Sequence, residues 1–181
     1  MIRRPPRSTL SSSSAASDVY KRQTYKGFLY AGLMINKNKI KVLEYNCRFG
    51  DPETQPILLR MKSDFLEMCF KACEKKLNDF AVEWEKKVSV GVVLASGGYP
   101  EYYEKGYEIK GIPEDTDDLK VFHCGTKSKD GKILTNGGRV LCITSKNEEL
   151  DKAIDLAYKA VEKINWQGSF YRSDIGQRKI N

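Results

Sequence analysis

Hydrophobic and polar positions alternate like strands at the start of the chain and then follow a helical spacing. The apolar runs Gly27–Ile35 and Ile40–Asn46 flank the turn-forming Asn36–Lys39, so the pattern predicts a β-hairpin. Ser63 and Asp64 are typical of a helix start. After them, apolar residues recur with helical periodicity through a charged background, at Phe65, Leu66, Met68, Cys69, Ala72, Cys73 and Leu77.

The second half of the chain reads as a set of short strands followed by a helix. Val88–Ser96 is a β-branched apolar run that predicts a buried strand. The stretches "KVFHCGT", "GKILT" and "GRVLCITS" predict further strands separated by Gly, Asp and Asn. Asn147 is expected to cap a helix over Glu148–Ile164. The predicted class is α+β, with a partly open, barrel-like sheet and helices on one side.

Composition places the chain among globular proteins and argues weakly against a nucleic-acid partner. The chain has 181 residues, 40% of them hydrophobic, and a net charge of +7. Residues 1–23 hold five Lys or Arg against one acid, so the remainder is only mildly basic. No apolar run is long enough to span a bilayer, so we expect no membrane association. Five cysteines form no tight framework, which favours free thiols in a reducing cytoplasm.

The first 23 residues differ from the rest. They are Ser-rich and basic, contain Pro5 and Pro6, and carry almost no large apolar side chains, so they are expected to be disordered. A transit peptide or a nucleic-acid arm would suit this composition. The segment also resembles translated adapter sequence fused to truncated genes. We favour that interpretation, in which residues 1–23 are a non-native tail and native sequence begins near Thr24.

The strand Ile40–Asn46 carries a candidate metal site. Side chains alternate along a strand, so Glu44 and Asn46 share one face, and Arg48 continues it if the strand runs that far. A carboxylate and an amide oxygen are hard ligands suited to Mg²⁺, which completes its shell with water and nucleotide phosphates. An adjacent Arg suits phosphate or an acyl phosphate. The alternative is a solvated edge strand, and spacing alone leaves it open.

The residues that follow carry a resemblance to a known family. "RFGDPETQ", from Arg48 to Gln55, resembles over its whole length the signature of the phosphoribosylamine–glycine ligases, also called glycinamide ribonucleotide synthetases. "LYAGLMI", "VVLASGGYP", "YEKG", "FHCGT", "GGRVL" and "FYRSDIGQR" also occur in the order expected for the C-terminal part of that family. The resemblance covers Thr24 to Asn181. The Glu-x-Asn-x-Arg core alone would indicate only the broader ATP-grasp superfamily.

This resemblance implies an activity and roles for individual residues. The family uses ATP to join glycine to 5-phosphoribosylamine in purine synthesis, by way of glycyl phosphate. The resemblance implies that Glu44 and Asn46 bind Mg²⁺ or Mn²⁺ and that Arg48 stabilises the phosphate. Asp51 and Glu53 are candidates near the substrate, although turn capping by Asp51 and an exposed Glu53 would explain them equally well.

Three later residues are weaker candidates for the phosphate of the ribosylamine: Arg139, Arg172 and Asp174. A structural Arg–Asp pair is at least as good an explanation there. His123 is the single histidine, and we expect it to be half-buried and structural.

The resemblance also predicts the domain organisation. Residues 24–77 would be the end of an ATP-grasp domain, a hairpin plus a helix; residues 78–87 a linker; and residues 88–181 a small C-terminal domain. The dinucleotide-fold half and most of the ATP-grasp body that the family carries do not occur in the sequence, so we expect the chain as written to be inactive. Two alternatives are another ATP-grasp carboxylate–amine ligase and a non-catalytic module with a basic, nucleic-acid-binding tail.

Overall fold

The computed structural model describes residues 25–36 and 39–177, which fall into two units. The N-terminal unit contains the residues up to Gly50 together with Phe65–Ala81, and the C-terminal unit contains Asp51–Asp64 and Val82–Asn181. The expectations about residues 1–23 lie outside the described residues. Each unit is made of two separate segments of the sequence, and these segments alternate along the chain. The domain boundaries expected from the resemblance remain predictions.

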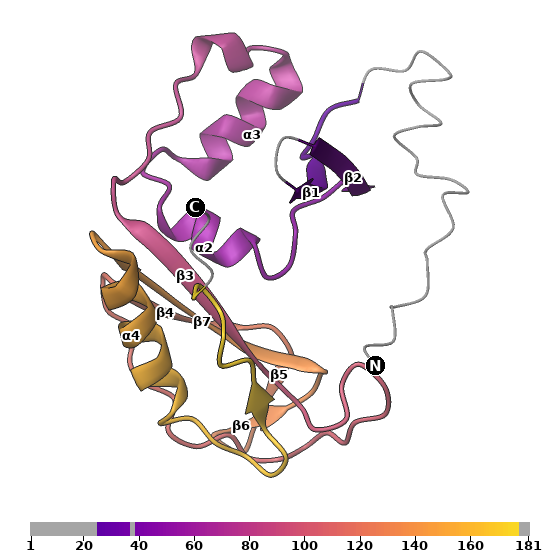
Figure 1. Ribbon diagram of the computed structural model, residues 1–181, viewed down its shortest axis with the longest axis vertical. Coiled ribbons are helices and arrows are strands. Elements are labelled where there is room, and N and C mark those ends of the chain that lie inside the picture. Colours follow the sequence, from indigo (N-terminus) through magenta and orange to yellow (C-terminus); the bar gives the residue numbers. More distant parts are fainter. Residues whose placement is uncertain (1–24, 37–38, 178–181) are drawn as a thin grey trace. The chain divides into compact units, whose positions relative to one another are not determined.

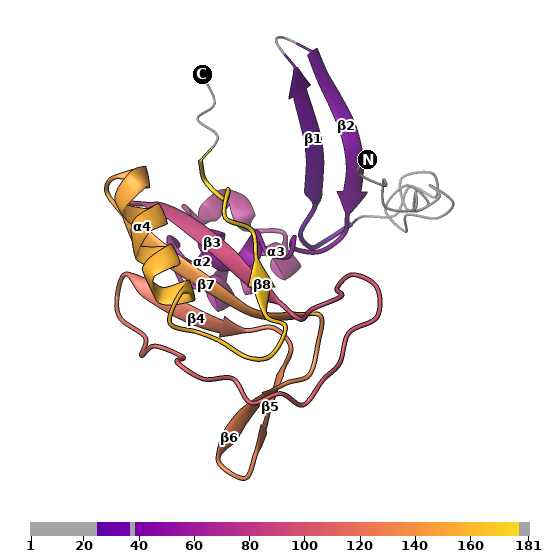
Figure 2. The same ribbon diagram turned by 60° about the horizontal axis from the view of Figure 1, so that its bottom comes forward.

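The N-terminal unit consists of a hairpin, a helix and a helical turn. Strands β1 (Tyr30–Asn36) and β2 (Lys39–Asn46) pair antiparallel, with an irregularity between Gly32 and Leu33, and the expected hairpin is confirmed (Figure 2). Helix α3 (Phe65–Glu74) is followed by the 3₁₀ turn η1 (Leu77–Asp79). Helix α3 begins directly after Ser63 and Asp64, as the sequence predicts, and the Ser63 hydroxyl also accepts a 2.7 Å hydrogen bond from the Glu83 backbone N–H.

The N-terminal unit has little core of its own. Three stacked rings hold it together: Phe28 and Phe49 lie 3.9 Å apart between ring centroids, and Phe65 lies 5.7 Å from Phe28. Among its described residues, only Gly32 and Gly50 are buried. A two-stranded hairpin is marginally stable alone. The aromatic cluster is therefore the main apolar contact within this unit.

The C-terminal unit is built on a four-stranded antiparallel sheet with strand order β4-β7-β3-β8 (Figures 1 and 2). Its strands are β3 (Val88–Ala95), β4 (Leu119–His123), β7 (Arg139–Asn147) and β8 (Phe170–Tyr171). A separate hairpin joins β5 (Thr126–Lys129) to β6 (Lys132–Thr135), with positive φ at Asp130 and Gly131 as tight hairpin turns require. The expected α+β class is confirmed, and the described strands form no closed barrel.

Helix α4 (Leu150–Val161) covers one face of this sheet and supplies its core. Val92 pairs with Ile143, and Ser145, on the same face, donates a 2.5 Å hydrogen bond to the Ala153 carbonyl of α4. The buried helical residues are Ala153, Ala157, Ala160 and Val161. The helix begins two residues later than the sequence predicts, because the Asn147 side chain accepts a hydrogen bond from the Glu149 N–H, in a turn that precedes the helix.

The other face of the sheet carries a helix that the sequence did not predict, α2 (Thr54–Leu59). Ser89 of β3 donates a 2.7 Å hydrogen bond to the Pro56 carbonyl, and a Cβ on Gly91 would lie 3.3 Å from Pro56 Cδ. In the sequence, Pro52 and Pro56 suggest an interruption of regular secondary structure. Pro56 is tolerated because it occupies the first turn, where helix N–H groups have no intrahelical acceptor. Within the described ranges, no helix is long and apolar enough to cross a bilayer.

Candidate functional site

The polar face expected on β2 exists in the structure. The Asn46 side-chain amide donates a 3.1 Å hydrogen bond to Glu44 Oε1, so the two side chains lie on the same side of the strand. Glu44 stands opposite Gly32 of β1, and a Cβ on Gly32 would come within 3.1 Å of Glu44 Cγ. The glycine therefore leaves room for the aliphatic stem of Glu44. This hydrogen bond uses an amide N–H, which leaves the Asn46 carbonyl oxygen and the second Glu44 oxygen as acceptors.

Arg48 does not continue this face. Strand β2 ends at Asn46, so the alternation stops before Arg48 is reached. The Arg48 guanidinium instead donates a 2.8 Å hydrogen bond to the carbonyl of Phe49, a member of the aromatic cluster. In the described part of the chain, no group of three or more His, Cys, Asp or Glu residues is arranged to hold a metal ion. Glu44 and Asn46 are thus a pair of oxygen donors rather than a complete metal cage.

In the C-terminal unit, an ion pair joins the loop before α2 to strand β7. Arg139 lies 3.1 Å from Asp51 Oδ2 and also donates a 3.0 Å hydrogen bond to the Asp51 backbone carbonyl. The Gln55 amide donates to the other Asp51 oxygen at 3.3 Å, while Gln55 Oε1 is buried without a hydrogen-bond partner. Burial, followed by the nearby Asp51 carboxylate, raises the pKa of Cys124. This corner thus combines a charged pair with an unpaired acceptor.

Two of the weaker candidates meet in one cavity of about 280 Å³. Arg139 and Arg172 both line it, together with aromatic and small residues: Pro52, Gly91, Val93, Ala95, Tyr99, Phe170, Tyr171 and Ile175. Arg172 forms a bidentate pair with Asp174, at 2.9 and 2.7 Å, and this hydrogen bonding raises the pKa of Arg172. The Tyr158 hydroxyl fixes the turn by donating to the Arg172 carbonyl at 2.7 Å. Two guanidinium groups beside an apolar wall suit an anionic ligand with a hydrophobic or ring-shaped body.

Two expectations about neighbouring residues need correction or refinement. His123 is exposed rather than half-buried, because it ends β4 at the edge of the sheet, where its Nδ1 lies 2.9 Å from the Thr126 hydroxyl. Glu53 occupies the N-cap position of α2 and is half-buried, and its side chain makes no capping hydrogen bond. Gln55 lies within "RFGDPETQ" but was not predicted as a candidate, and the aromatic wall made by Tyr99 and Phe170 was not predicted either.

Comparisons with known proteins agree with these features. A family profile described as "Phosphoribosylglycinamide synthetase, ATP-grasp (A) domain" matches residues 13–54, and one described as "Phosphoribosylglycinamide synthetase, C domain" matches residues 89–178. The phosphoribosylamine–glycine ligase of Vibrio vulnificus is 53% identical over 158 residues, which are 86% of this chain and 37% of the relative. That of Salmonella typhimurium is 55% identical over 160 residues, 87% of this chain and 37% of the relative.

Solved structures give the same family. The phosphoribosylamine–glycine ligase of Thermotoga maritima matches with a TM-score of 0.74 and 39% identity, over 86% of this chain and 38% of that one. The biotin carboxylase domain of a thermophilic 2-oxoglutarate carboxylase matches with a TM-score of 0.57 at 12% identity, a likeness in fold alone. The chain spans a little over a third of the length of these curated relatives. It belongs to the phosphoribosylglycinamide synthetase family, within the ATP-grasp superfamily.

Proposed function

We propose that this chain is the C-terminal part of an ATP-dependent ligase that joins glycine to 5-phosphoribosylamine, giving glycinamide ribonucleotide for purine biosynthesis. The observation that carries the proposal is the 53–55% identity to relatives named phosphoribosylamine–glycine ligase. The activity is assigned to the longer protein, because the chain spans 37% of those relatives. The chain by itself is proposed to be inactive.

The pair Glu44 and Asn46 would hold a divalent cation, Mg²⁺ or Mn²⁺. Their donor atoms fit that role, since both can offer hard oxygens and their mutual 3.1 Å hydrogen bond orients them on one face of β2. Mg²⁺ usually takes one or two carboxylates and completes its shell with water and substrate phosphates. When bound, it would neutralise charge on the phosphates of ATP. This explains why two protein donors suffice on this strand.

The reaction proposed for the longer protein has two steps that balance. A carboxylate oxygen of glycine attacks the γ-phosphorus of ATP, ADP leaves, and glycyl phosphate forms. The amine nitrogen of 5-phosphoribosylamine then attacks the carbonyl carbon and displaces inorganic phosphate, losing a proton to solvent. Arg48 would supply fixed positive charge beside the acyl phosphate, because a guanidinium is always charged and binds phosphate in a bidentate manner.

The cavity that contains Arg139 and Arg172 is the proposed site for the phosphorylated ribose. Its two guanidinium groups match a phosphate, and the rings of Tyr99 and Phe170 match the sugar face. Asp174 would orient Arg172 through their bidentate pair, and Asp51 would do the same for Arg139. We also propose Glu53 as a residue near the substrate.

The comparisons do not favour the two alternatives, another ATP-grasp carboxylate–amine ligase and a nucleic-acid-binding module. The first alternative, another ATP-grasp ligase, differs from our proposal in the substrate that the enzyme would use. A relative of the present family would require glycine, whereas another ligase would turn over without it. We propose a cytoplasmic location, in keeping with five free cysteines.

The test is a chimera in which residues 24–181 replace the matching part of the Salmonella typhimurium relative. We expect glycine-dependent ADP release in the presence of 5-phosphoribosylamine. Glu44→Gln and Asn46→Ala should each lower turnover and raise the Mg²⁺ concentration needed for half-maximal rate. Tyr45→Phe is the matched control, since Tyr45 pairs with Ala31 and lies on the opposite face of β2 from Glu44. Normal turnover of both variants at low Mg²⁺ would refute the metal assignment.

A second measurement addresses the chain alone. Calorimetric titration of the 181-residue chain with Mg·ATP should give no saturable heat, because the polar pair on β2 is only part of a nucleotide site. Micromolar binding would contradict the proposed inactivity of the isolated chain. It would leave the family membership intact, since that rests on sequence identity.

A further inference from the structure

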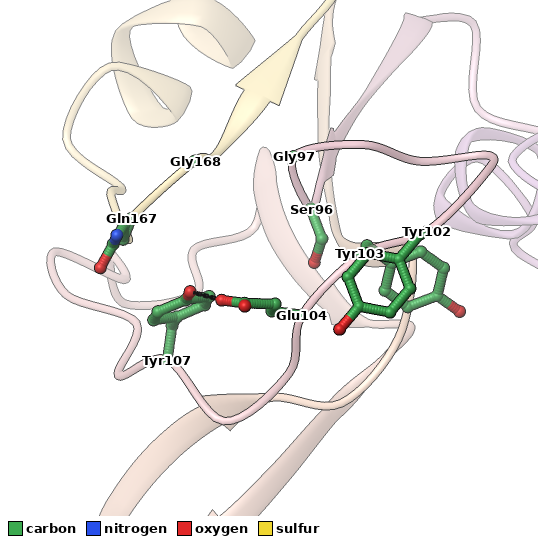
Figure 3. Close-up of a pocket in the computed structure, with 8 residues that line it drawn as sticks. All are labelled: Ser96, Gly97, Tyr102, Tyr103, Glu104, Tyr107, Gln167 and Gly168. Atoms are coloured by element: carbon green, nitrogen blue, oxygen red, sulfur yellow. Dashed lines mark hydrogen bonds between the residues drawn. The ribbon is translucent and has the colours of Figure 1, made fainter.

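A cavity in the C-terminal unit is lined by none of the residues assigned above. Its volume is about 250 Å³, and Figure 3 shows its lining: Ser96, Gly97, Tyr102, Tyr103, Glu104, Tyr107, Gln167 and Gly168. Three of these residues are tyrosines. Among the described residues that line the cavity, Glu104 alone carries a charge. The cavity thus has an aromatic and anionic character, although the chain as a whole carries a net charge of +7.

Backbone contacts hold one wall of this cavity in place. Ser96 is 2% exposed, its N–H donates to the Gly138 carbonyl at 2.8 Å, and its hydroxyl donates to the Gly137 carbonyl at 2.9 Å. Tyr103 lies against Gly138, where an added Cβ would come within 3.1 Å of the ring carbon Cε1. The Tyr99 ring lies closer still to the position of that Cβ, so it is chiefly Tyr99 that requires a glycine here. This wall therefore consists of Ser96, which two hydrogen bonds fix, and the Tyr103 ring beside Gly138.

The opposite wall is anchored in the same way. The Tyr107 N–H donates to the Thr135 hydroxyl at 3.1 Å, and the Thr135 N–H donates to the Tyr107 carbonyl at 2.8 Å. Thr135 is fully buried at the end of β6. The Tyr107 hydroxyl donates a hydrogen bond to Glu104, which raises the pKa of Tyr107 and keeps it neutral. In Figure 3, Glu104 is drawn between the rings of Tyr107 and Tyr103.

The chemistry of these walls selects positive charge. Tyrosine faces carry the negative part of the ring quadrupole and attract cations within about 6 Å of the ring centroid. Tyr103 already attracts one, since Lys105 Nζ lies 5.8 Å from its centroid. A carboxylate beside such rings adds a full opposite charge, and the Ser96 and Gln167 side chains add polar contacts.

We propose that this cavity binds a small organic cation through its ammonium group. Glu104 supplies the counter-charge, and the Tyr103 and Tyr107 rings supply the faces that surround the cation. The volume of about 250 Å³ is below the range of about 300–1,000 Å³ for drug-sized ligands, so a head group fits better than a large molecule. The proposal does not depend on the ligase activity, because it uses neither the β2 pair nor the arginine-lined cavity.

The experiment titrates the full chain with choline and, separately, with its neutral isostere 3,3-dimethylbutan-1-ol, while tyrosine ring resonances are followed by NMR. Choline should shift the Tyr103 and Tyr107 rings saturably, and the isostere should bind at least about tenfold more weakly, since it lacks the charge. Equal binding of the two compounds would overturn the proposal. So would a saturable response to D-ribose with none to choline, which would mark a site for neutral hydroxyl groups.

Variants locate the binding within the cavity. Glu104→Gln and Tyr103→Leu should each weaken choline binding by about tenfold. Tyr107→Phe keeps the ring and should keep binding. Glu101→Gln is the matched control, because it removes an exposed carboxylate that does not line the cavity. Each variant is accepted only if its backbone NMR spectrum matches that of the parent, and unchanged affinity in a folded Glu104→Gln would refute the role of the carboxylate.

Discussion

The hairpin of the N-terminal unit and the sheet of the C-terminal unit are both antiparallel, but they differ in what covers them. Strand β2 has no buried residue, whereas residues 140–146 of β7 are all buried. Large apolar side chains of the hairpin stay exposed, among them Ile35 at 68% and Ile40 at 66%. Every buried hydrophobic residue of the described chain belongs to the C-terminal unit. An apolar sequence pattern therefore makes a strand in both units, but it makes a core only where a second layer covers it.

The largest expected contrast is in thiol chemistry. Cys142 of β7 is fully buried, and burial raises its pKa to about 12, whereas Cys73 of α3 is exposed. Labelling with iodoacetamide, followed by peptide mass spectrometry, should modify Cys142 at least about a thousandfold more slowly than Cys73, because Cys142 reacts only after unfolding. In denaturant the two rates should converge. Comparable rates in the native chain would mean that the C-terminal core is not closed.

A matched pair of isoleucine truncations tests the same comparison in free energy of unfolding. Ile143→Ala removes a fully buried side chain packed against Val92 and Val121, and should cost about 2–5 kcal/mol. Ile40→Ala removes a side chain that is 66% exposed and should change stability by less than about 0.5 kcal/mol. Urea unfolding followed by far-UV circular dichroism, which reports on both units, measures both. Similar costs would imply that the hairpin is covered in solution, for instance by self-association.

The exposed hairpin face should also reveal itself by binding hydrophobic dye. Ile35 and Ile40 stand directly opposite each other, so replacing both with Thr keeps the strand propensity and removes apolar surface. We expect lower ANS fluorescence and less light scattering, with the stability of the C-terminal unit unchanged within about 0.5 kcal/mol. Lys41→Thr, on the same strand, is the control and should leave dye binding unchanged. If the double variant bound as much ANS as the parent, the apolar surface that binds the dye would lie elsewhere in the chain.

The sequence predicted some features of both units and missed others for identifiable reasons. Alternation was enough for β1, β2, β3 and β7 and for the shared face of Glu44 and Asn46, because these depend on local periodicity. Helix α2 was missed because Pro56 reads as a break unless its first-turn position is known. The meeting of Arg139 and Arg172 in one cavity was equally out of reach, since it depends on how β7 and the segment after β8 pack. Strand β8 has two residues, which are too few to show an alternation of hydrophobic and polar positions.

The smallest contrast concerns ion pairs and pH. In the C-terminal unit, Lys146 lies 2.7 Å from Glu85 and its side chain is only 11% exposed, whereas Lys76 and Glu74 in the N-terminal unit are 57% and 53% exposed at 3.1 Å. The Lys146 hydrogen bond lowers the pKa of Glu85 below its ordinary value of 4.5. A carboxyl whose pKa is lower in the folded state adds stability above pH 4.5, and this stability disappears as the pH falls through the folded value.

Glu85→Gln should therefore reduce the unfolding midpoint at pH 7 and reduce it less at pH 3, where the parent has also lost the interaction. Glu74→Gln should have no measurable effect at either pH, because solvent-exposed pairs contribute almost nothing. Urea midpoints at the two pH values provide the measurement. A Glu85→Gln deficit that persists undiminished at pH 3 would show that Glu85 acts through packing rather than charge. An equal loss in Glu74→Gln would remove the distinction between the covered and the uncovered unit.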